Sequence, residues 1–130
     1  MLILTLRTDK PEAELGLYED TTEIIYVTWQ AHRQLAETIH SKLSELLQNQ
    51  NKELKDIQGI VFYKGPGSFT GLRIGASVAD TLAYSLSIPI VGVGGEAWRS
   101  TGMQKIVRGE DNKIVTLEYG APVRITQQKK

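Results

Sequence analysis

The sequence predicts an α/β fold in which helices flank a mixed β-sheet. Early segments alternate apolar and polar residues, as half-buried strands do, whereas two later segments repeat apolar or small residues at helical spacing. A short apolar run follows each of these helical segments, which gives the strand–helix–strand order of parallel neighbours. At 130 residues the chain is expected to form one domain.

The N-terminal third is predicted to form three strands. Residues 1–7 (MLILTLR) form the first, and residues 13–19 and 22–28 form a hairpin with Glu19 and Asp20 at its tip. The alternating apolar positions of this hairpin are Leu15, Leu17, Ile24 and Tyr26.

The middle of the chain is predicted to alternate between helices and buried strands. A helix over residues 32–48 carries its apolar residues on one face, and asparagines after it act as stop signals. A buried strand is expected over 59–64, a second helix over 69–86 and another strand over 89–93.

The C-terminal third is predicted to hold a short helix and a closing hairpin. The helix spans residues 95–104, and the hairpin joins strands 113–119 and 122–126. We therefore expect one domain over residues 1–126, with its core in 1–95, its closing hairpin in 113–126 and a frayed tail at 127–130.

The most distinctive segment is GPGSFTGLRIG, residues 65–75, which leaves a buried strand and opens a helix. Gly65 and Gly67 flank Pro66 where the chain reverses direction, because glycine adopts positive φ without steric cost. Ser68 or Thr70 is expected to cap the following helix.

Small residues recur every four positions along that second helix. Gly71 and Gly75 lie inside it, where each glycine costs about 1 kcal/mol relative to alanine, and Ala79 and Ala83 extend the series. A helix keeps such residues where another backbone approaches closely. We expect this stripe to receive a neighbouring helix or strand.

A phosphate-binding role for the loop is the alternative, since N–H groups at a helix N-terminus attract anions. The spacing matches neither dinucleotide nor P-loop patterns, and no Lys-Ser or Lys-Thr pair follows. Arg73 could neutralise an anion, or it could pair with Asp80 or with a partner carboxylate. A packing role is favoured.

The amino-acid composition argues against several kinds of binding site. Lys plus Arg and Asp plus Glu both number 15, so direct binding of nucleic acid by this chain is not expected. The absence of cysteine excludes disulfides and thiolate metal sites, and with no signal-peptide core in MLILTLR it favours a soluble cytoplasmic protein. His32 and His40 are eight residues apart, which does not suit a metal pair, and no catalytic constellation is visible.

The motif GPGSFTGLRIG resembles the signature of the TsaB family, which serves the synthesis of tRNA N6-threonylcarbamoyladenosine. The helix HRQLAETIHSKLSELL (32–47), the strand GIVFYKGPG, the segment SIPIVGV and the end YGAPVRIT (119–126) are also similar to that family. The resemblance covers residues 1–95 well and 113–126 loosely. It implies an actin-like, ribonuclease-H-like lobe that acts as a non-catalytic subunit without a cofactor of its own.

The resemblance also implies partners. Members of the family bind a catalytic TsaD-like subunit through a bundle of the first two helices, in a complex that includes a TsaE-like ATPase and meets tRNA only as a whole. Expected contact residues are His32, Leu35, Ala36, Ile39, Leu43, Gly71, Leu72, Gly75, Ala79 and Ala83. The motif loop comprises Gly65, Pro66, Gly67, Ser68, Phe69, Thr70 and Arg73. On this view Gly75→Leu abolishes the association and leaves the monomer folded.

Two departures from the family pattern matter. Typical members are nearly twice as long, and residues 98–112 stand where they have a second lobe. Arg7 stands where actin-like relatives carry an aspartate. A nucleotide- or phosphate-binding enzyme fragment and a stand-alone homodimer built on the same helices therefore remain alternatives.

Overall fold

The computed structural model describes residues 1–118. Their secondary structure is a series of strands and helices with two short 3₁₀ turns. In chain order these are β1 (Leu2–Arg7), β2 (Glu12–Glu19), β3 (Thr22–Gln30), η1 (His32–Gln34), α1 (Leu35–Asn49), η2 (Leu54–Asp56), β4 (Gly59–Tyr63), α2 (Phe69–Leu86), β5 (Ile90–Val93) and α3 (Trp98–Val107).

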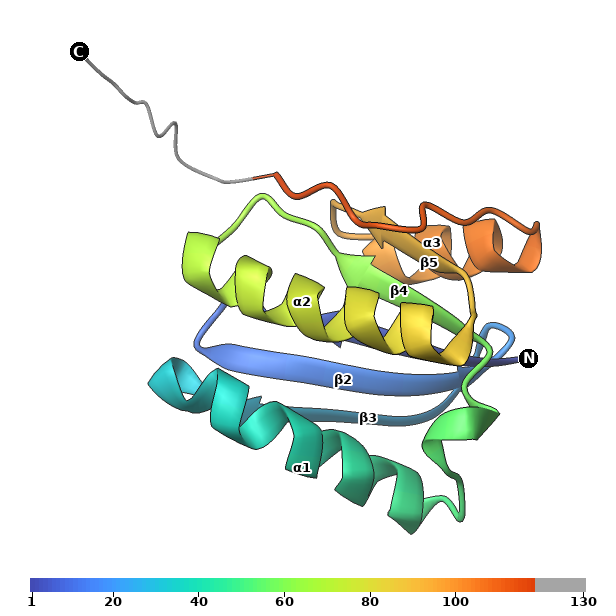
Figure 1. The fold of residues 1–130 in the computed structure, drawn as a ribbon, viewed down its shortest axis with the longest axis horizontal. Coiled ribbons are helices and arrows are strands. Elements are labelled where there is room, and N and C mark those ends of the chain that lie inside the picture. Colours follow the sequence, from blue (N-terminus) through green and yellow to red (C-terminus); the bar gives the residue numbers. More distant parts are fainter. Residues whose placement is uncertain (119–130) are drawn as a thin grey trace.

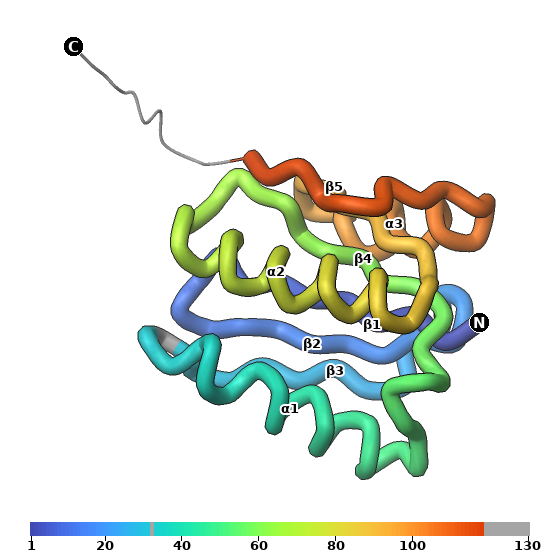
Figure 2. Tube along the Cα trace, viewed as in Figure 1, coloured from blue at the N-terminus to red at the C-terminus, as the bar shows by residue number. Residues whose placement is uncertain are grey.

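The strands form one sheet in the order β3-β2-β1-β4-β5 (Figures 1 and 2). The central strand β1 runs antiparallel to β2 and parallel to β4. Leu4 on β1 stands beside Leu17 of β2 and Ile60 of β4, and all three are buried. A central strand that is covered on both faces has a near-continuous apolar sequence, and in β1 only Thr5 interrupts the apolar residues 2–6. The predicted mixed sheet is confirmed.

Helices cover both faces of this sheet. α1 and α2 lie on one face, and α3 lies behind the opposite face (Figure 1). Two successive residues of β4 mark the two sides, because Phe62 approaches α2 at Gly75 and Val61 approaches α3 at Gly102. Both side chains are fully buried, so the core has two layers that share β4.

The end of α1 follows the expected stop signal. Asn51, with φ +57°, adopts the left-handed conformation just after α1, and Ser87 does the same at the end of α2. The observed α2 has the predicted bounds. The first α-helix begins at Leu35 rather than at residue 32, because His32–Gln34 form a 3₁₀ turn. The third helix lies three residues later than predicted.

The predicted strand over residues 113–119 is wrong for its described part. Residues 111–118, here called the strap, contain no strand, because their backbone groups bond to scattered points of the body. The N–H of Val115 donates to Asp80 on α2 at 3.1 Å, and the N–H of Glu118 donates to the carbonyl of Lys64 at 2.8 Å. The remainder of the predicted hairpin, through residue 126, lies outside the described residues.

The strap also caps the outer edge of β5. The N–H of Ile90 donates to Asp111 Oδ1 at 3.1 Å, and the N–H of Gly92 donates to Asn112 Oδ1 at 2.8 Å. The N–H of Asn112 in turn donates to the carbonyl of Ile90 at 2.7 Å. An edge strand with unpaired backbone groups can pair with other chains. Here the side chains of Asp111 and Asn112 bind the outward N–H groups of β5 and so protect this edge.

Within residues 1–118, none of the helices combines the length and the hydropathy that a transmembrane segment requires.

Asp80 predicts a pH-dependent contribution to stability. Burial raises the pKa of this carboxyl above its usual 3.8, against the smaller opposite effect of the hydrogen bond from Val115. The unfolded chain therefore releases this proton first, and stability from this group is lost as the pH rises through the folded pKa. We expect Asp80→Asn, whose amide oxygen still accepts from Val115, to raise the free energy of unfolding at pH 7.

The measurement is urea denaturation of both proteins at pH 7 and near pH 4. The gain should shrink toward the lower pH, because the wild-type carboxyl becomes neutral there. An Asp80→Asn variant that is less stable than wild type at pH 7 would contradict this assignment.

Candidate functional site

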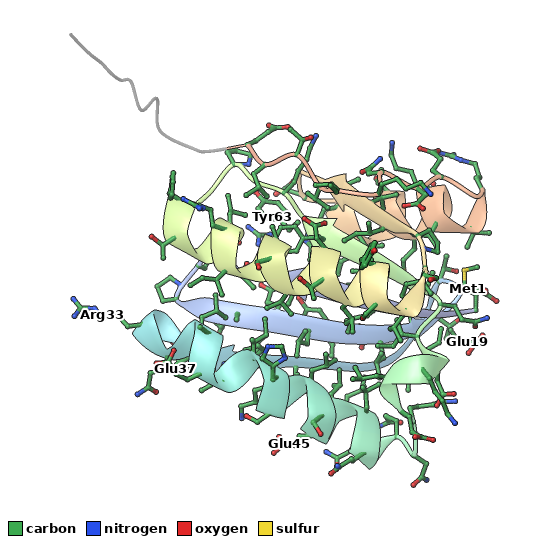
Figure 3. The ribbon with its side chains drawn as sticks, viewed as in Figure 1. Met1, Glu19, Arg33, Glu37, Glu45 and Tyr63 are labelled. Atoms are coloured by element: carbon green, nitrogen blue, oxygen red, sulfur yellow. The ribbon has the colours of Figure 1, made fainter. Side chains whose placement is uncertain are left out.

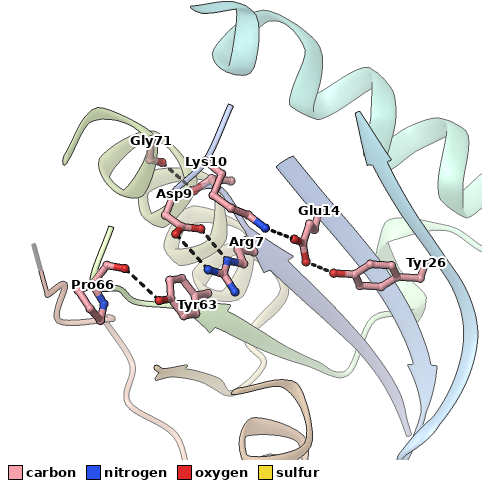
Figure 4. Close-up of polar contacts among 9 residues, drawn as sticks. Arg7, Asp9, Lys10, Glu14, Tyr26, Tyr63, Pro66 and Gly71 are labelled. Carbon is pink, nitrogen blue, oxygen red and sulfur yellow. Dashed lines mark hydrogen bonds and ion pairs between the residues drawn. The ribbon is translucent and has the colours of Figure 1, made fainter. Parts of the chain in front are cut away.

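The glycines of α2 bring that helix into close contact with the end of β1. A Cβ on Gly71 would overlap the backbone carbonyl of Thr8, and one on Gly75 would overlap the Thr8 side chain and Phe62. The hydroxyl of Thr8, itself buried, donates to the carbonyl of Gly71 at 2.7 Å (Figure 4). The expected close backbone approach is therefore present, but it lies within the chain.

This contact corrects the role predicted for the small-residue stripe. Gly75, Ala79 and Ala83 are buried against the sheet, so they do not form a smooth outer surface for a partner. The same packing argues against the expectation that Gly75→Leu leaves the monomer folded, since a leucine there would meet Thr8 and Phe62.

The turn before α2 rests on the same end of β1. Gly65 has φ +115°, and the Gly65–Pro66 peptide bond is cis. The hydroxyl of Tyr63 donates to the Pro66 carbonyl at 2.9 Å, and Gly67 lies so close to Asp9 that a Cβ would overlap it. The loop thus fits between Tyr63 and Asp9.

An ion pair joins Arg7 and Asp9 at this edge of the sheet (Figure 4). The guanidinium donates to the carboxylate at 2.7 and 3.2 Å, and its carbon lies 3.8 Å from the centre of the Tyr63 ring. Burial by itself lowers the pKa of Arg7, but the hydrogen bond and charge of Asp9 outweigh it and hold the pKa above its usual value. The spacing of Arg7 and Asp9, two residues apart, is the sequence signal for this pair.

Two predicted side-chain roles in the motif differ from the structure. Ser68 occupies the N-cap position of α2, yet no side chain caps that helix end. Within residues 1–118 no ion pair joins Arg73 to Asp80, which accepts from the N–H of Val115. The guanidinium of Arg73 instead lies over the Phe69 ring, 5.3 Å from its centre.

A hollow of 790 Å³ opens beside the N-terminal ends of α1 and α2. It is the place where a phosphate at the loop would lie, and Thr8, Asp9, Lys10, Ser68 and Thr70 help to line it. Asp9 brings negative charge to this wall, and Lys10 donates to Glu14 at 2.7 Å (Figure 4). Across residues 1–118 there is no cluster of three or more side chains suited to a metal ion.

Most of the contact residues predicted on the two helices face inward. Within the core are Leu35, Ile39, Leu43, Leu72, Gly75, Ala79 and Ala83. Gly71 is only partly exposed and lies on Thr8, whereas Ala36 is exposed. The side chain of His32 lies outside the described part of the chain.

The outer surfaces of α1 and α2 form a groove instead. Its apolar lining includes Leu43 and Leu47 of α1 together with Val78 and Leu82 of α2, and its volume is 510 Å³. A second hollow of 540 Å³ shares His40, Ser77 and Val78 with it, so the groove continues toward the start of both helices.

Small or short residues border this groove at a spacing of four. On α2 they are Ser77, Thr81 and Ser85, and on α1 they are Ala36 and Ser44. The larger His40 lies between these two on α1, at the same spacing. All six are exposed. Sequence reasoning missed the serine–threonine series, which has the same period as the glycine stripe. Only the position of the sheet decides which stripe faces outward.

The family described as "TsaD: tRNA N6-adenosine threonylcarbamoyltransferase" matches residues 27–95, more than half of the chain. The chain belongs to this family. The matched region begins in β3 and ends after β5, so it contains α1, α2 and the glycine-rich turn.

Curated relatives that are similar to the chain include proteins named TsaB. The chain is 29% identical to the tRNA threonylcarbamoyladenosine biosynthesis protein TsaB of Buchnera aphidicola (Schizaphis graminum) over 95% of this chain and 61% of that protein. Identity to TsaB of Bacillus subtilis is 37% over 72% of this chain and 41% of that protein. The chain therefore spans between two fifths and three fifths of the length of these relatives.

A solved structure of YeaZ from Pseudomonas aeruginosa superposes with a TM-score of 0.67 at 26% identity. The match covers 78% of this chain and 50% of YeaZ. The fold is thus the actin-like, ribonuclease-H-like fold, as the resemblance implied.

The contact between Gly71 and Thr8 predicts a loss of stability on substitution. Alanine gains about 1 kcal/mol of helix propensity over glycine, but its Cβ would overlap the Thr8 carbonyl, which is backbone and cannot swing away. We expect Gly71→Ala to lower the free energy of unfolding by about 1–3 kcal/mol. Urea denaturation measures it, with Ser77→Ala on the outer face of the same helix as the control. Equal stability of the two variants would refute the contact.

Proposed function

We propose that this chain is a non-catalytic partner subunit in the synthesis of tRNA N6-threonylcarbamoyladenosine, and that it binds a TsaD-like transferase. The groove between α1 and α2 carries this proposal. It is an apolar, open surface on the very segment, residues 27–95, that is similar to the transferase family.

The groove suits a helix of a partner. Helices pack at interaxial distances of about 8–10 Å, with the shorter distances where contact side chains are small. Here Ser77 and Thr81 on α2 and Ala36 and Ser44 on α1 leave room for such an approach. The exposed Leu54 and the partly buried Val78 and Leu82 give the partner apolar area to bury. Since the transferase carries the matching segment, two related helix pairs would pack together as a bundle.

A non-catalytic role is supported by the chemistry of the loop edge. Asp9, the carboxylate at this edge, accepts hydrogen bonds from Arg7 at 2.7 and 3.2 Å, so both of its oxygens already have a partner within the chain. His40 borders the groove and does not line the hollow that Asp9 lines. In this proposal the TsaE-like ATPase and tRNA belong to the complex, and this chain, with balanced charge, does not hold tRNA by itself.

A bulky charge in the groove tests the proposal. Thr81 is exposed on the outer face of α2, so Thr81→Arg should leave the fold intact while it blocks helix approach. We expect affinity for the host's TsaD-like protein to fall at least tenfold, about 1.4 kcal/mol, in calorimetry or co-purification. Thr116→Arg, on the strap, is the matched control and should bind as wild type.

A modification assay with the reconstituted complex should show the same order of variants. Unchanged binding by Thr81→Arg would exclude the groove as the interface. If neither the wild type nor either variant binds the TsaD-like protein, that protein is not the partner.

A further inference from the structure

The groove between α1 and α2 has an excess of basic side chains, although acidic and basic residues are equal in number over the whole chain. Arg73 lines one end of the groove, Lys52 lines the other, and His40 borders both of its hollows. Within residues 1–118, no ion pair engages Arg73 or Lys52. Glu53 is the one acidic residue of the described lining, and its carboxylate already lies 3.6 Å from Lys55 Nζ. The groove therefore presents positive charge that its own acidic residue does not neutralise.

Arg73 is placed so that it can bind an acidic group from another molecule. Its guanidinium lies over the Phe69 ring, 5.3 Å from the ring centre, and both side chains line the second hollow. Stacking occupies the flat face of a guanidinium and leaves the N–H groups at its edge able to donate. Two of these groups match the two oxygens of a carboxylate. The hydroxyls of Thr70 and Ser77 line the same hollow and add further donors.

The apolar lining of the groove favours a carboxylate on a protein over a phosphate of nucleic acid. Ile74, Val78 and Leu82 of α2 are partly buried and line the groove between its two cationic ends. Nucleic-acid binding draws its affinity from many phosphate contacts with lysine and arginine. An amphipathic helix instead buries apolar area and brings isolated charges to fixed positions, which selects the correct partner.

We propose that the helix surface of the partner that enters the groove carries carboxylates, and that one of them binds Arg73 beside His40. This inference rests on the proposed function and adds the chemistry by which the partner is recognised. The apolar centre of the groove supplies area to bury, and the charge of Arg73 selects a partner surface that is acidic at this end.

His40 makes this recognition depend on pH. A histidine gains positive charge as the pH falls between about 8 and 5. Three charged residues share the groove with it, namely Arg73 on α2 and Lys52 and Glu53 after α1. On α1 itself, Glu37 lies one turn earlier and is directed away from the sheet (Figure 3). Protonation of His40 thus adds to the positive excess, and affinity for an acidic helix should rise as the pH falls.

Calorimetry with the host's TsaD-like protein tests the role of Arg73. We expect Arg73→Gln to raise the dissociation constant about three- to tenfold, between the effects of an exposed and a partly desolvated ion pair. Arg73→Lys should lie between wild type and Arg73→Gln, because it keeps the charge and loses the planar fork. Arg108→Gln, at the end of α3 on the opposite face of the sheet, removes the same charge and is the matched control. It should bind as wild type.

The outcomes separate this inference from the proposed function. Equal affinity of Arg73→Gln and Arg108→Gln, in an assay where Thr81→Arg has lost binding, would overturn this inference alone. A wild-type chain that does not bind the TsaD-like protein would overturn both. In a gel-shift assay with tRNA and this chain alone we expect no complex. A tRNA complex that Arg73→Gln weakens would assign the charge of the groove to nucleic acid and would overturn the inference.

The same titration at pH 6 and pH 8 tests the position of His40. We expect wild type to bind about two- to threefold more tightly at pH 6, relative to the change shown by His40→Gln. Titration of groups on the partner affects both proteins equally, so the difference between them belongs to His40. An identical pH dependence of wild type and His40→Gln would overturn the placement of the carboxylate beside His40.

Discussion

The contact between α2 and the carboxyl end of β1 is the interaction on which the rest of this structure depends. Gly71 and Gly75 let the helix axis approach Thr8 so closely that any side chain would collide, and the Thr8 hydroxyl fixes the approach with a hydrogen bond. The preceding turn is fitted between Tyr63 and Asp9. Helix and turn are thus placed by one strand end.

This inward use of the glycines determines what the chain shows to other molecules. Because the glycine–alanine stripe faces the sheet, the opposite side of α2 carries Ser77 and Thr81 to the surface beside α1. Burial of α1 through its leucines leaves Glu37 and Glu45 directed away from the sheet (Figure 3). The groove between the helices is therefore a consequence of core packing, and it is the surface that we assign to a TsaD-like partner.

Local patterns in the sequence were enough for most of the fold. The strand periods, the apolar run of β4 and the stop of α1 near Asn51 are properties of neighbouring residues, so they could be read without a structure. The sequence alone did not show which face of α2 points toward the sheet and which points outward. Both the Gly71 and the Ser77 stripes repeat every four residues, and only long-range contact with Thr8 distinguishes them.

The strap and the ion pair of Arg7 show the same limit. The segment KIVTLE has strand propensity. Isolated hydrogen bonds from Val115 to Asp80 and from Glu118 to Lys64 nevertheless hold it outside the sheet. Arg7 forms an ion pair with Asp9, two residues along the chain, and a cation–π contact with Tyr63 on the neighbouring strand β4. Only the first contact joins residues that are close in the sequence.

Cross-saturation NMR on the complex with the TsaD-like protein tests the central claim most directly. Irradiation of the partner should attenuate amide signals of Ala36, His40, Ser77 and Thr81, because these residues border the groove. Signals of Gly75 should keep their intensity, since that residue is buried against β1. Attenuation centred on the turn at residues 65–68 or on β3, with the groove unaffected, would contradict the account.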